Sequence, residues 1–270
     1  MKIIKTSADK DTTSSLRSAS SVGVFVKELE HALLAGEIDI AVHSMKDVPI
    51  QIAAGLRIAA VPEREDARDA LIAPQAKRLS ELTEGARIGT GSVRRQAQLL
   101  AIRPDLQILD IRGNVDTRLK KLQEGEYDAI MLACAGLRRL RLQDRISLPL
   151  DFGSMLPAPG QGALAVEIRR NDPGIESMAA ALNHALTAIA VTAERGFLQR
   201  MGGGCNVPVA VYASAQQDVL HIEALVASPD GRQIVRDSAH TNVKGADEAV
   251  RLLADRMLSR GARAILDAGL

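Results

Sequence analysis

The chain has 270 residues, 46% hydrophobic and 25% charged, which is typical of a soluble globular protein of two or three domains. Its net charge of +1 excludes a global field that attracts nucleic acid or membrane surfaces, and its 2% aromatic content argues against a base-stacking platform. The two cysteines, Cys134 and Cys205, cannot form a disulfide framework, no apolar run is long enough to span a bilayer, and the first residues lack a signal-peptide pattern, so a cytoplasmic protein is expected.

The N-terminal part of the chain is expected to form a first α/β unit. Residues 6–21 are rich in Ser and Thr and predict a loop. Phe25–Ala35 has apolar residues at helical spacing and ends at Gly36, a residue typical of a helix C-terminus. Ile38–Val42 is a short β-branched run that predicts a buried strand, and Leu56–Val61 predicts a second strand.

The turn that follows the first of these strands carries the most suggestive chemistry. The stretch AVHSMKDVP at Ala41–Pro49 places His43, Ser44, Lys46 and Asp47 at the carboxyl end of the strand, where ligands bind in open α/β sheets. A carboxylate beside a cation can stay ionised there and stabilise a positive charge that develops on a substrate. An ordinary polar loop with a local Lys–Asp pair explains the same residues equally well.

A second α/β unit follows the charged run 62–68, which is expected to cross between domains. Strands are expected at 70–73, 87–90, 106–111 and 128–133, and helices at 93–102, 115–122 and 134–142. Alternating strands and helices are typical of βαβ units, so we expect a mostly parallel sheet.

This second unit is rich in arginine. The chain contains 25 Arg and 9 Lys, and residues 87–145 hold 12 basic residues against 7 acidic ones. Basic side chains follow three strand ends, at Arg94, Arg95, Arg112, Arg118, Arg138 and Arg139. Helix N-termini at Ser92 and Asn114 would add backbone N–H groups, so the pattern predicts a cleft for a small polyanion. Solvated helix faces account for some of these arginines.

The C-terminal part predicts a small α+β domain. After the turn-rich link 156–163, a strand at 164–168 is expected to return to the first unit, and a helical region is expected over 175–200. Strands are expected at 207–213, 219–227 and 232–239, followed by an amphipathic helix over 246–266.

The two cysteines have different surroundings in the sequence. Three glycines, Gly202–Gly204, precede Cys205, so its thiol is a candidate covalent attachment point on a loop that can approach another group closely. A tight turn followed by a small buried side chain is the alternative. Cys134 follows an apolar strand and is expected in the core. The Cys and His residues lack metal-ligand spacing, so we expect no metal site.

Seven segments together carry a family resemblance. They are FVKELE at 25–30, AVHSMKDVP at 41–49, GTGSVRRQAQL at 89–99, IRGNVDTRL at 111–119, DAIMLACAGLRRL at 128–140, LPAPGQGA at 156–163 and GGCNVP at 203–208. In this order and spacing, over nearly all of the chain, they resemble the porphobilinogen deaminase (hydroxymethylbilane synthase) family.

The resemblance implies an α/β fold with three domains. Two are lobes similar to those of periplasmic binding proteins, with the active cleft between them, and the third is a small α+β domain that carries the cysteine loop. The expected ranges are 1–62 with 162–182 for the first domain, 63–161 for the second and 183–270 for the third.

The resemblance also implies roles for particular residues. Cys205 matches the cysteine that holds a dipyrromethane cofactor through a thioether, and Asp47 matches the catalytic aspartate. Cofactor contacts are implied for Ser44, Lys46, Thr90, Ser92, Arg94 and Arg95. Substrate contacts are implied for Arg112, Asn114, Arg118, Arg139, Gln161 and Gly162.

The implied activity is that of a transferase of tetrapyrrole and heme biosynthesis. It deaminates porphobilinogen, joins four such molecules head to tail on the dipyrromethane primer and releases hydroxymethylbilane by hydrolysis. The resemblance implies a cytoplasmic monomer whose partner is this small substrate, with no metal, nucleic acid or membrane involved.

The sequence also departs from the family pattern. The family's leading βα unit, which takes ~30 or more residues, has no counterpart before Met1, so the first sheet is expected to expose an edge or an apolar face. Val22 stands where the family usually has Lys, and Gly91 where it usually has Ser. A non-catalytic binder of pyrrole carboxylates therefore remains an alternative. An anion-binding protein of the periplasmic type is disfavoured by the lack of a signal peptide.

Overall fold

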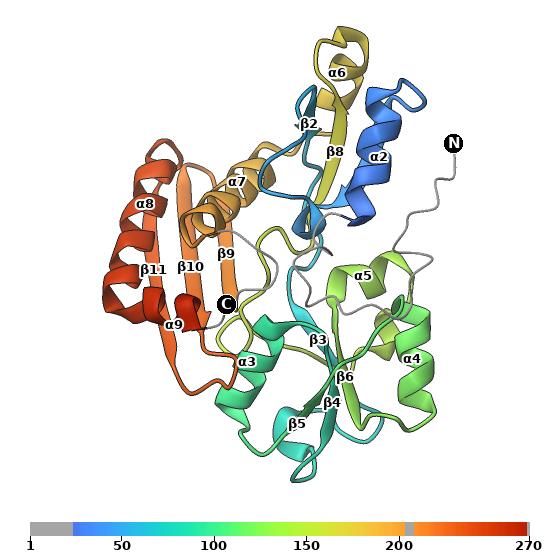
Figure 1. Ribbon diagram of the computed structural model, residues 1–270, viewed down its shortest axis with the longest axis vertical. Coiled ribbons are helices and arrows are strands. Elements are labelled where there is room, and N and C mark those ends of the chain that lie inside the picture. The colour runs from blue at the N-terminus through green and yellow to red at the C-terminus, as the bar shows by residue number, and fades with distance from the viewer. Residues whose placement is uncertain (1–23, 203–207, 269–270) are drawn as a thin grey trace.

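The part of the chain that the structure describes forms three sheets, each with its own helices (Figure 1). The computed structural model describes residues 24–202 and 208–268. In Figure 1 the first sheet lies at the upper right, the second at the lower right and the third at the left. The strands of each sheet fall within one of the three expected domain ranges, whose boundaries remain a prediction.

The first sheet has three antiparallel strands in the order β1-β8-β2. Its strands are β1 (Ile40–Ser44), β2 (Leu56–Ala60) and β8 (Leu164–Arg169), and its helices are α2 (Val24–Leu34) and α6 (Pro173–Ala180). The strand after the turn-rich link does return to this sheet, as expected. Leu33 of α2 is fully buried against Ala41 and Leu56, which fixes α2 on one face of the sheet.

The strand β1 is an edge strand in the part of the chain that the structure describes. Its side chains alternate between exposed and buried, with Ile40 39% and Val42 57% exposed. The prediction of a buried strand is therefore wrong, because only the face of β1 that carries Ala41 and His43 is covered. Within residues 24–202 and 208–268, the first sheet thus has an exposed edge at β1, one of the two outcomes expected from the sequence.

The second sheet has five strands in the order β5-β4-β6-β3-β7. Its strands are β3 (Asp69–Ile72), β4 (Arg87–Gly89), β5 (Gln107–Leu109), β6 (Ala129–Ala133) and β7 (Leu148–Pro149), with helices α3 (Val93–Ile102), α4 (Val115–Gln123) and α5 (Cys134–Arg139). The strand β4 is parallel to β5 and β6, whereas β3 is antiparallel to β6 and β7.

The second sheet is therefore mixed: the parallel pairs of β4 with β5 and β6 are as expected, whereas β3 runs against both of its neighbours. The chain enters β3 from the link with the first sheet and runs away from that link, whereas β4, β5 and β6 run back toward it. The first residue of β3, Asp69, consequently pairs with Ala133 at the carboxyl end of β6. This reversal brings a carboxylate to the sheet edge where the arginines gather.

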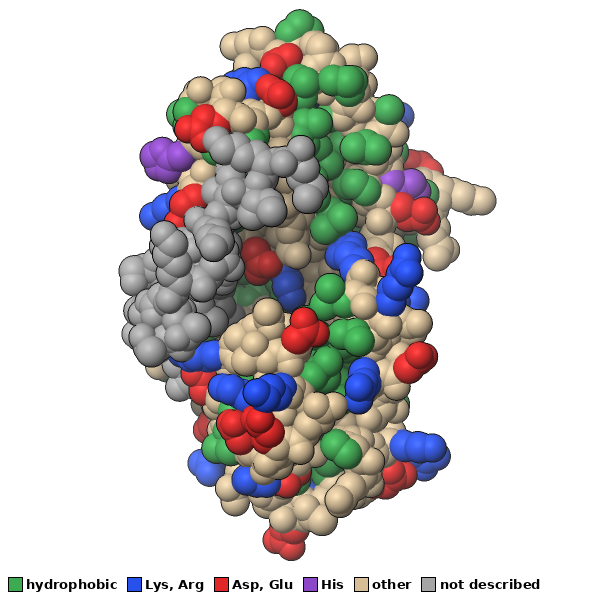
Figure 2. Space-filling model, turned by 90° about the vertical axis from the view of Figure 1, so that its right-hand side faces the viewer, with side chains coloured by type: hydrophobic (Ala, Val, Ile, Leu, Met, Phe, Trp, Pro, Cys, Tyr) green, Lys and Arg blue, Asp and Glu red, His purple; other side chains and the backbone are tan. Residues whose placement is uncertain are grey.

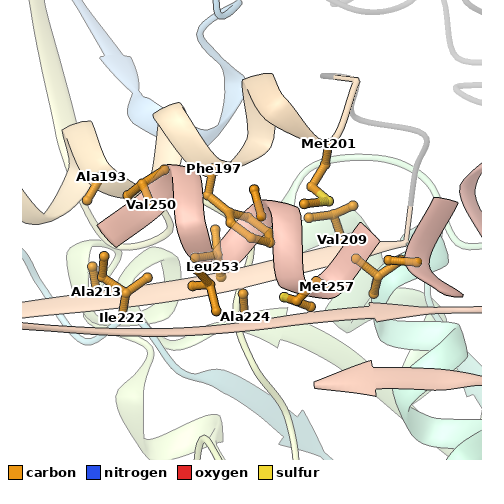
Figure 3. Close-up of a cluster of buried hydrophobic side chains, with 14 of the residues drawn as sticks. Ala193, Phe197, Met201, Val209, Ala213, Ile222, Ala224, Val250, Leu253 and Met257 are labelled. Carbon is orange, nitrogen blue, oxygen red and sulfur yellow. The ribbon is translucent and has the colours of Figure 1, made fainter. Parts of the chain in front are cut away.

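The third sheet packs against two long helices. Its strands are β9 (Val209–Gln216), β10 (Val219–Ala227) and β11 (Ile234–Asn242), and its helices are α7 (Ala185–Arg200), α8 (Ala246–Met257) and α9 (Arg263–Ala268). Figure 3 shows Phe197 of α7 and Leu253 of α8 in the core over Ile222 of β10.

The expected helical region over 175–200 contains two helices, and the single helix expected over 246–266 is interrupted. The region 175–200 divides into α6 and α7, because His184 caps a new helix by accepting the N–H of Thr187. The region 246–266 divides into α8 and α9 around Gly261, whose φ of 106° is not helical. No helix in the two described ranges is long and apolar enough to cross a membrane.

The three units meet at one buried carboxylate. Glu194 of α7 is 0% exposed and accepts hydrogen bonds from the Arg64 guanidinium (2.5 Å), the Gly160 N–H (2.6 Å) and the Ala213 N–H (2.8 Å). Arg64 and Gly160 belong to the two links between the first and second sheets, and Ala213 belongs to β9. Glu194 therefore ties both links to the third unit.

Candidate active site

A cavity of about 200 Å³ lies where the three units meet. Its lining contains six of the polar residues that the resemblance singles out: Lys46, Asp47, Ser92, Arg94, Arg95 and Gln161. The rest of the lining is Ala158, Pro159, Leu198 and Val209. Figure 2 shows a recess in the middle of one face of the molecule, with acidic and basic side chains inside it.

The turn after β1 is held in place by close backbone packing. Met45 is buried, and its N–H donates to the Ala163 carbonyl at 3.0 Å. Gly160, with φ of 73°, lies so close that a Cβ there would approach Met45 Cγ to 2.7 Å. This close approach requires glycine at position 160. It fixes the turn whose residues Lys46 and Asp47 line the cavity.

Lys46 and Asp47 differ in their surroundings. Asp47 is exposed and Lys46 is half-buried. Burial lowers the pKa of Lys46, and the nearby Arg95 lowers it further, while the Asp47 carboxylate opposes both effects. The turn therefore offers an accessible carboxylate beside a cation that loses its proton more readily than an ordinary lysine.

Two buried arginines begin α3 on the other side of the cavity. Ser92 caps this helix by accepting the N–H of Arg95 at 3.4 Å, and Arg94 and Arg95 are each only 6% exposed. Arg94 donates to Asp69 at 2.7 Å and Arg95 donates to Asp69 at 2.6 Å. Although burial alone would raise the pKa of Asp69, the two guanidinium groups hold it well below its usual range. The cluster keeps a net positive charge beside the cavity.

Gln161, in the second link between the first and second sheets, connects the Asp69 cluster to Ala67 in the first link. Its Nε2 donates to the Ala67 carbonyl at 2.7 Å and to Asp69 at 3.0 Å. Its Oε1 is buried and has no hydrogen-bond partner within residues 24–202 and 208–268. An unsatisfied buried acceptor is costly, so this oxygen suits a ligand that donates an N–H group, as a pyrrole does.

The loop after β5 lies outside the lining of this cavity. Asn114 caps α4 by accepting the N–H of Thr117, and the Arg118 Nε donates to the Gly113 carbonyl at 2.8 Å. Arg112 is held by Asp110, with its Nη2 at 2.9 Å from the carboxylate. Burial lowers the pKa of Arg118, and the nearby Arg95 lowers it further.

The remaining predicted residues are not part of the lining of this cavity. Ser44 is exposed at the end of β1, and Thr90 is buried, with its hydroxyl accepting the Ser92 N–H at 3.2 Å. Arg139 donates to the Gly162 carbonyl at 2.7 Å. Gly162 has φ of 87°, and a Cβ there would overlap the Glu65 carbonyl oxygen, so only glycine fits.

Several predictions about single residues can be compared with the structure. Cys134 is fully buried, which confirms its expected place in the core, and burial raises the pKa of its thiol to about 11. Cys205 and Val22 lie outside the described residues. Arg138, expected after a strand end, lies in α5 directly after β6 and pairs with Asp66 at 3.1 Å and with Glu65 at 3.3 Å. Among the described residues, no group of three or more His, Cys, Asp or Glu side chains could hold a metal ion.

Asp69 is the main site residue that sequence reasoning missed. The sequence does contain a signal for it, because Asp69 begins the apolar stretch DALI, which predicts a buried strand. A buried aspartate needs a charged partner, so this position indicates a buried ion pair. The partner itself is not visible in the sequence, since Arg94 lies 25 positions away.

Two family models match the chain. Residues 1–177 match the model described as porphobilinogen deaminase, dipyromethane cofactor binding domain, and residues 188–259 match the model of the porphobilinogen deaminase C-terminal domain. Among solved structures, a periplasmic substrate-binding protein of an ABC transporter from Coxiella burnetii is 17% identical with a TM-score of 0.40, over 57% of this chain and 74% of that one.

Curated relatives resemble the chain over almost its whole length. The porphobilinogen deaminase of Pelobacter propionicus is 49% identical over 264 residues, which are 98% of this chain and 85% of the relative. Those of Syntrophomonas wolfei and Thermus thermophilus are each 48% identical, over 98% of this chain and 87% of the relative. With both domain models matched, the chain belongs to the porphobilinogen deaminase family, the transferases that make hydroxymethylbilane on a dipyrromethane cofactor.

Proposed function

We propose that the cavity between the turn after β1, the start of α3 and Gln161 is the active site, and that Asp47 is its catalytic carboxylate. One observation carries the proposal. An accessible aspartate and a lysine face two buried arginines and an unsatisfied amide oxygen across a single cavity. This donor and acceptor set fits a ligand that combines carboxylates with pyrrole N–H groups.

Asp47 supports the step that creates positive charge. When the C–N bond of porphobilinogen breaks, ammonia leaves with the bonding electron pair, and positive charge spreads over the pyrrole ring. An ionised carboxylate next to the ring lowers the energy of this state, because the opposite charges attract without any protein reorganisation. The same carboxylate can accept the pyrrole N–H and so orient the ring.

The basic residues bind the acidic arms of the rings. Arg94 and Arg95 are fixed by Asp69, so their guanidinium groups are positioned before a ligand arrives. Lys46, Ser92 and Thr90 complete the proposed cofactor contacts. We infer that Arg112, Asn114, Arg118, Arg139 and the Gln161–Gly162 segment bind the carboxylates of incoming substrate. Guanidinium groups suit this task because they bind carboxylates in two-point fashion.

The cofactor fits the residues that the structure describes. Ser92, Arg94, Arg95 and Lys46 can hold its carboxylates, and the buried Gln161 oxygen can accept a pyrrole N–H. We propose that the Cys205 thiol anchors it through a thioether. When bound, the dipyrromethane supplies the free pyrrole carbon to which substrate is joined. We also infer a cytoplasmic monomer that binds no nucleic acid or membrane, in keeping with its near-zero net charge.

The test is an Asp47→Asn variant, assayed for conversion of porphobilinogen into hydroxymethylbilane. The substitution keeps the size of the side chain and removes its charge, so turnover should fall at least a hundredfold while the thermal unfolding midpoint stays the same. The matched control is Asp218→Asn, an exposed aspartate of the third unit, which should retain normal turnover. Near-normal turnover by Asp47→Asn would remove Asp47 from this role.

A further inference from the structure

We propose that Asp110 competes, from within the chain, with the substrate carboxylate that Arg112 binds, and that Gly91 provides the space for this competitor. The inference rests on the proposed role of Arg112 and adds a residue that weakens substrate binding. It also gives a physical account of Gly91, one of the two positions at which the sequence departs from the family pattern.

Asp110 and Gly91 lie next to each other because their strands are parallel. Gly91 follows β4 and Asp110 follows β5, and the Thr90 N–H donates to the Leu109 carbonyl at 2.9 Å. Both residues therefore stand at the carboxyl edge of the second sheet, where the anion-binding residues are gathered. A carboxylate at this edge lies among groups that are proposed to bind carboxylates.

Asp110 holds Arg112 in the manner expected of a substrate carboxylate. The Arg112 Nε and Nη2 atoms donate to one oxygen of Asp110, at 3.0 Å and 2.9 Å. The pair is open to solvent, with 23% of the Arg112 side chain and 40% of the Asp110 side chain exposed. A substrate carboxylate can reach this guanidinium group, but it must displace Asp110 or share Arg112 with it.

Gly91 permits this arrangement because it lacks a side chain. A Cβ on residue 91 would lie 2.9 Å from the second oxygen of Asp110, closer than real Cβ atoms approach other atoms. Any larger residue at this position must push the Asp110 carboxylate aside. A serine at this position would therefore disturb the pair with Arg112.

Asp110 also changes the electrostatics around a second arginine. Burial and the nearby Arg95 lower the pKa of Arg118, whereas Asp110 raises it. The Asp110 charge thus offsets part of the positive potential that attracts acidic substrates. Removing it should favour substrate binding both at Arg112 and at Arg118, with the larger effect at Arg112.

The experiment compares KM for porphobilinogen in three variants of the full chain. Asp110→Asn and Gly91→Ala should each lower KM about two- to fivefold, the range expected when an exposed ion pair no longer competes. Asp105→Asn is the matched control, because Asp105 also pairs with an arginine two residues away, Arg103, at 2.7 Å, but at the opposite end of β5. Its KM should stay unchanged.

Two further variants separate this inference from the proposed function. Arg112→Gln should raise KM, and adding Asp110→Asn to it should then change KM little, because the competition needs Arg112. An unchanged or higher KM for Asp110→Asn, with Arg112→Gln still raising KM, would overturn the inference and leave the role of Arg112 intact. An unchanged KM for Arg112→Gln would contradict both. Thermal unfolding midpoints confirm that each variant is folded.

Discussion

Lys46, beside the proposed catalytic aspartate, has a pKa below that of an ordinary lysine. Burial and Arg95 lower the pKa of Lys46, so its positive charge is lost at a pH below that of an ordinary lysine. Binding of the acidic pyrrole rings should weaken as this charge disappears. We therefore expect the deprotonation of Lys46 to cause the loss of activity at alkaline pH.

This predicts a particular pH dependence. KM for porphobilinogen should rise with increasing pH before the ordinary lysine pKa of ~10.4 is reached. A Lys46→Arg variant should lose most of that rise, because arginine stays charged throughout this range. Ionisation of the substrate affects both proteins equally, and Lys244→Arg, at an exposed site of the third unit, serves as control. Superimposable profiles for wild type and Lys46→Arg would exclude this residue as the cause.

The candidate site residues could be predicted from the sequence where they are neighbours in one short stretch. The stretch around Lys46 and Asp47 identifies the turn, because its polar residues directly follow an apolar strand. The partners of these residues were not predictable, since the contact of Met45 with Gly160 joins positions far apart in the chain. The unsatisfied oxygen of Gln161 likewise depends on packing that no local pattern encodes.

At the scale of elements, the start of α3 depends on Asp69. This aspartate is fully buried at the beginning of β3, and it holds both arginines of the first turn of α3. Removing one member of a buried ion cluster leaves uncompensated charge in the interior, which is among the most destabilising changes that a point mutation makes.

An Asp69→Asn variant should therefore be less stable than the wild type by about 3–5 kcal/mol at pH 7. The native pKa of Asp69 is depressed, so its contribution is complete above the unfolded-state pKa of ~3.9 and declines as the pH falls below that value. Urea unfolding at pH 7 and pH 3 measures both effects. The control is Asp255→Asn, which breaks an exposed pair with Arg251 and should cost at most about 1 kcal/mol. Equal losses in the two variants would contradict this account.

The order of elements was predictable, but the direction of one strand was not. Helix α3 begins at the predicted residue because Ser92 is a good N-cap, and Gly36 ends α2 as expected. Local periodicity says nothing of the direction in which β3 enters its sheet. That direction depends on the link from the first sheet, and it brings Asp69 to the site.

At the scale of the whole molecule, Glu194 holds the three units together. It receives hydrogen bonds from Arg64 and Gly160 in the two links and from Ala213 in β9. The second link lines the cavity with Ala158, Pro159 and Gln161, and Leu198 of α7 lines it as well, so the position of this link relative to α7 affects the shape of the site. The sequence does not predict this junction, because its residues lie far apart in the chain, between positions 64 and 213.

Glu194→Gln should lower the free energy of unfolding by about 3–5 kcal/mol, because Arg64 is left without its buried partner. The matched control is Glu176→Gln, which breaks the exposed pair with Arg57 and should cost at most about 1 kcal/mol. Differential scanning calorimetry and urea unfolding measure the two losses. A stability of Glu194→Gln within 1 kcal/mol of the wild type would show that the junction is held by other contacts.

The covalent primer is the feature on which the whole reaction depends, and intact-mass measurement tests it most directly. After incubation with porphobilinogen, the wild-type chain and a Cys134→Ala control should both carry the added mass of one dipyrromethane, and Cys205→Ala should carry none. An unmodified wild-type mass, or an adduct that disappears in Cys134→Ala and persists in Cys205→Ala, would contradict the account.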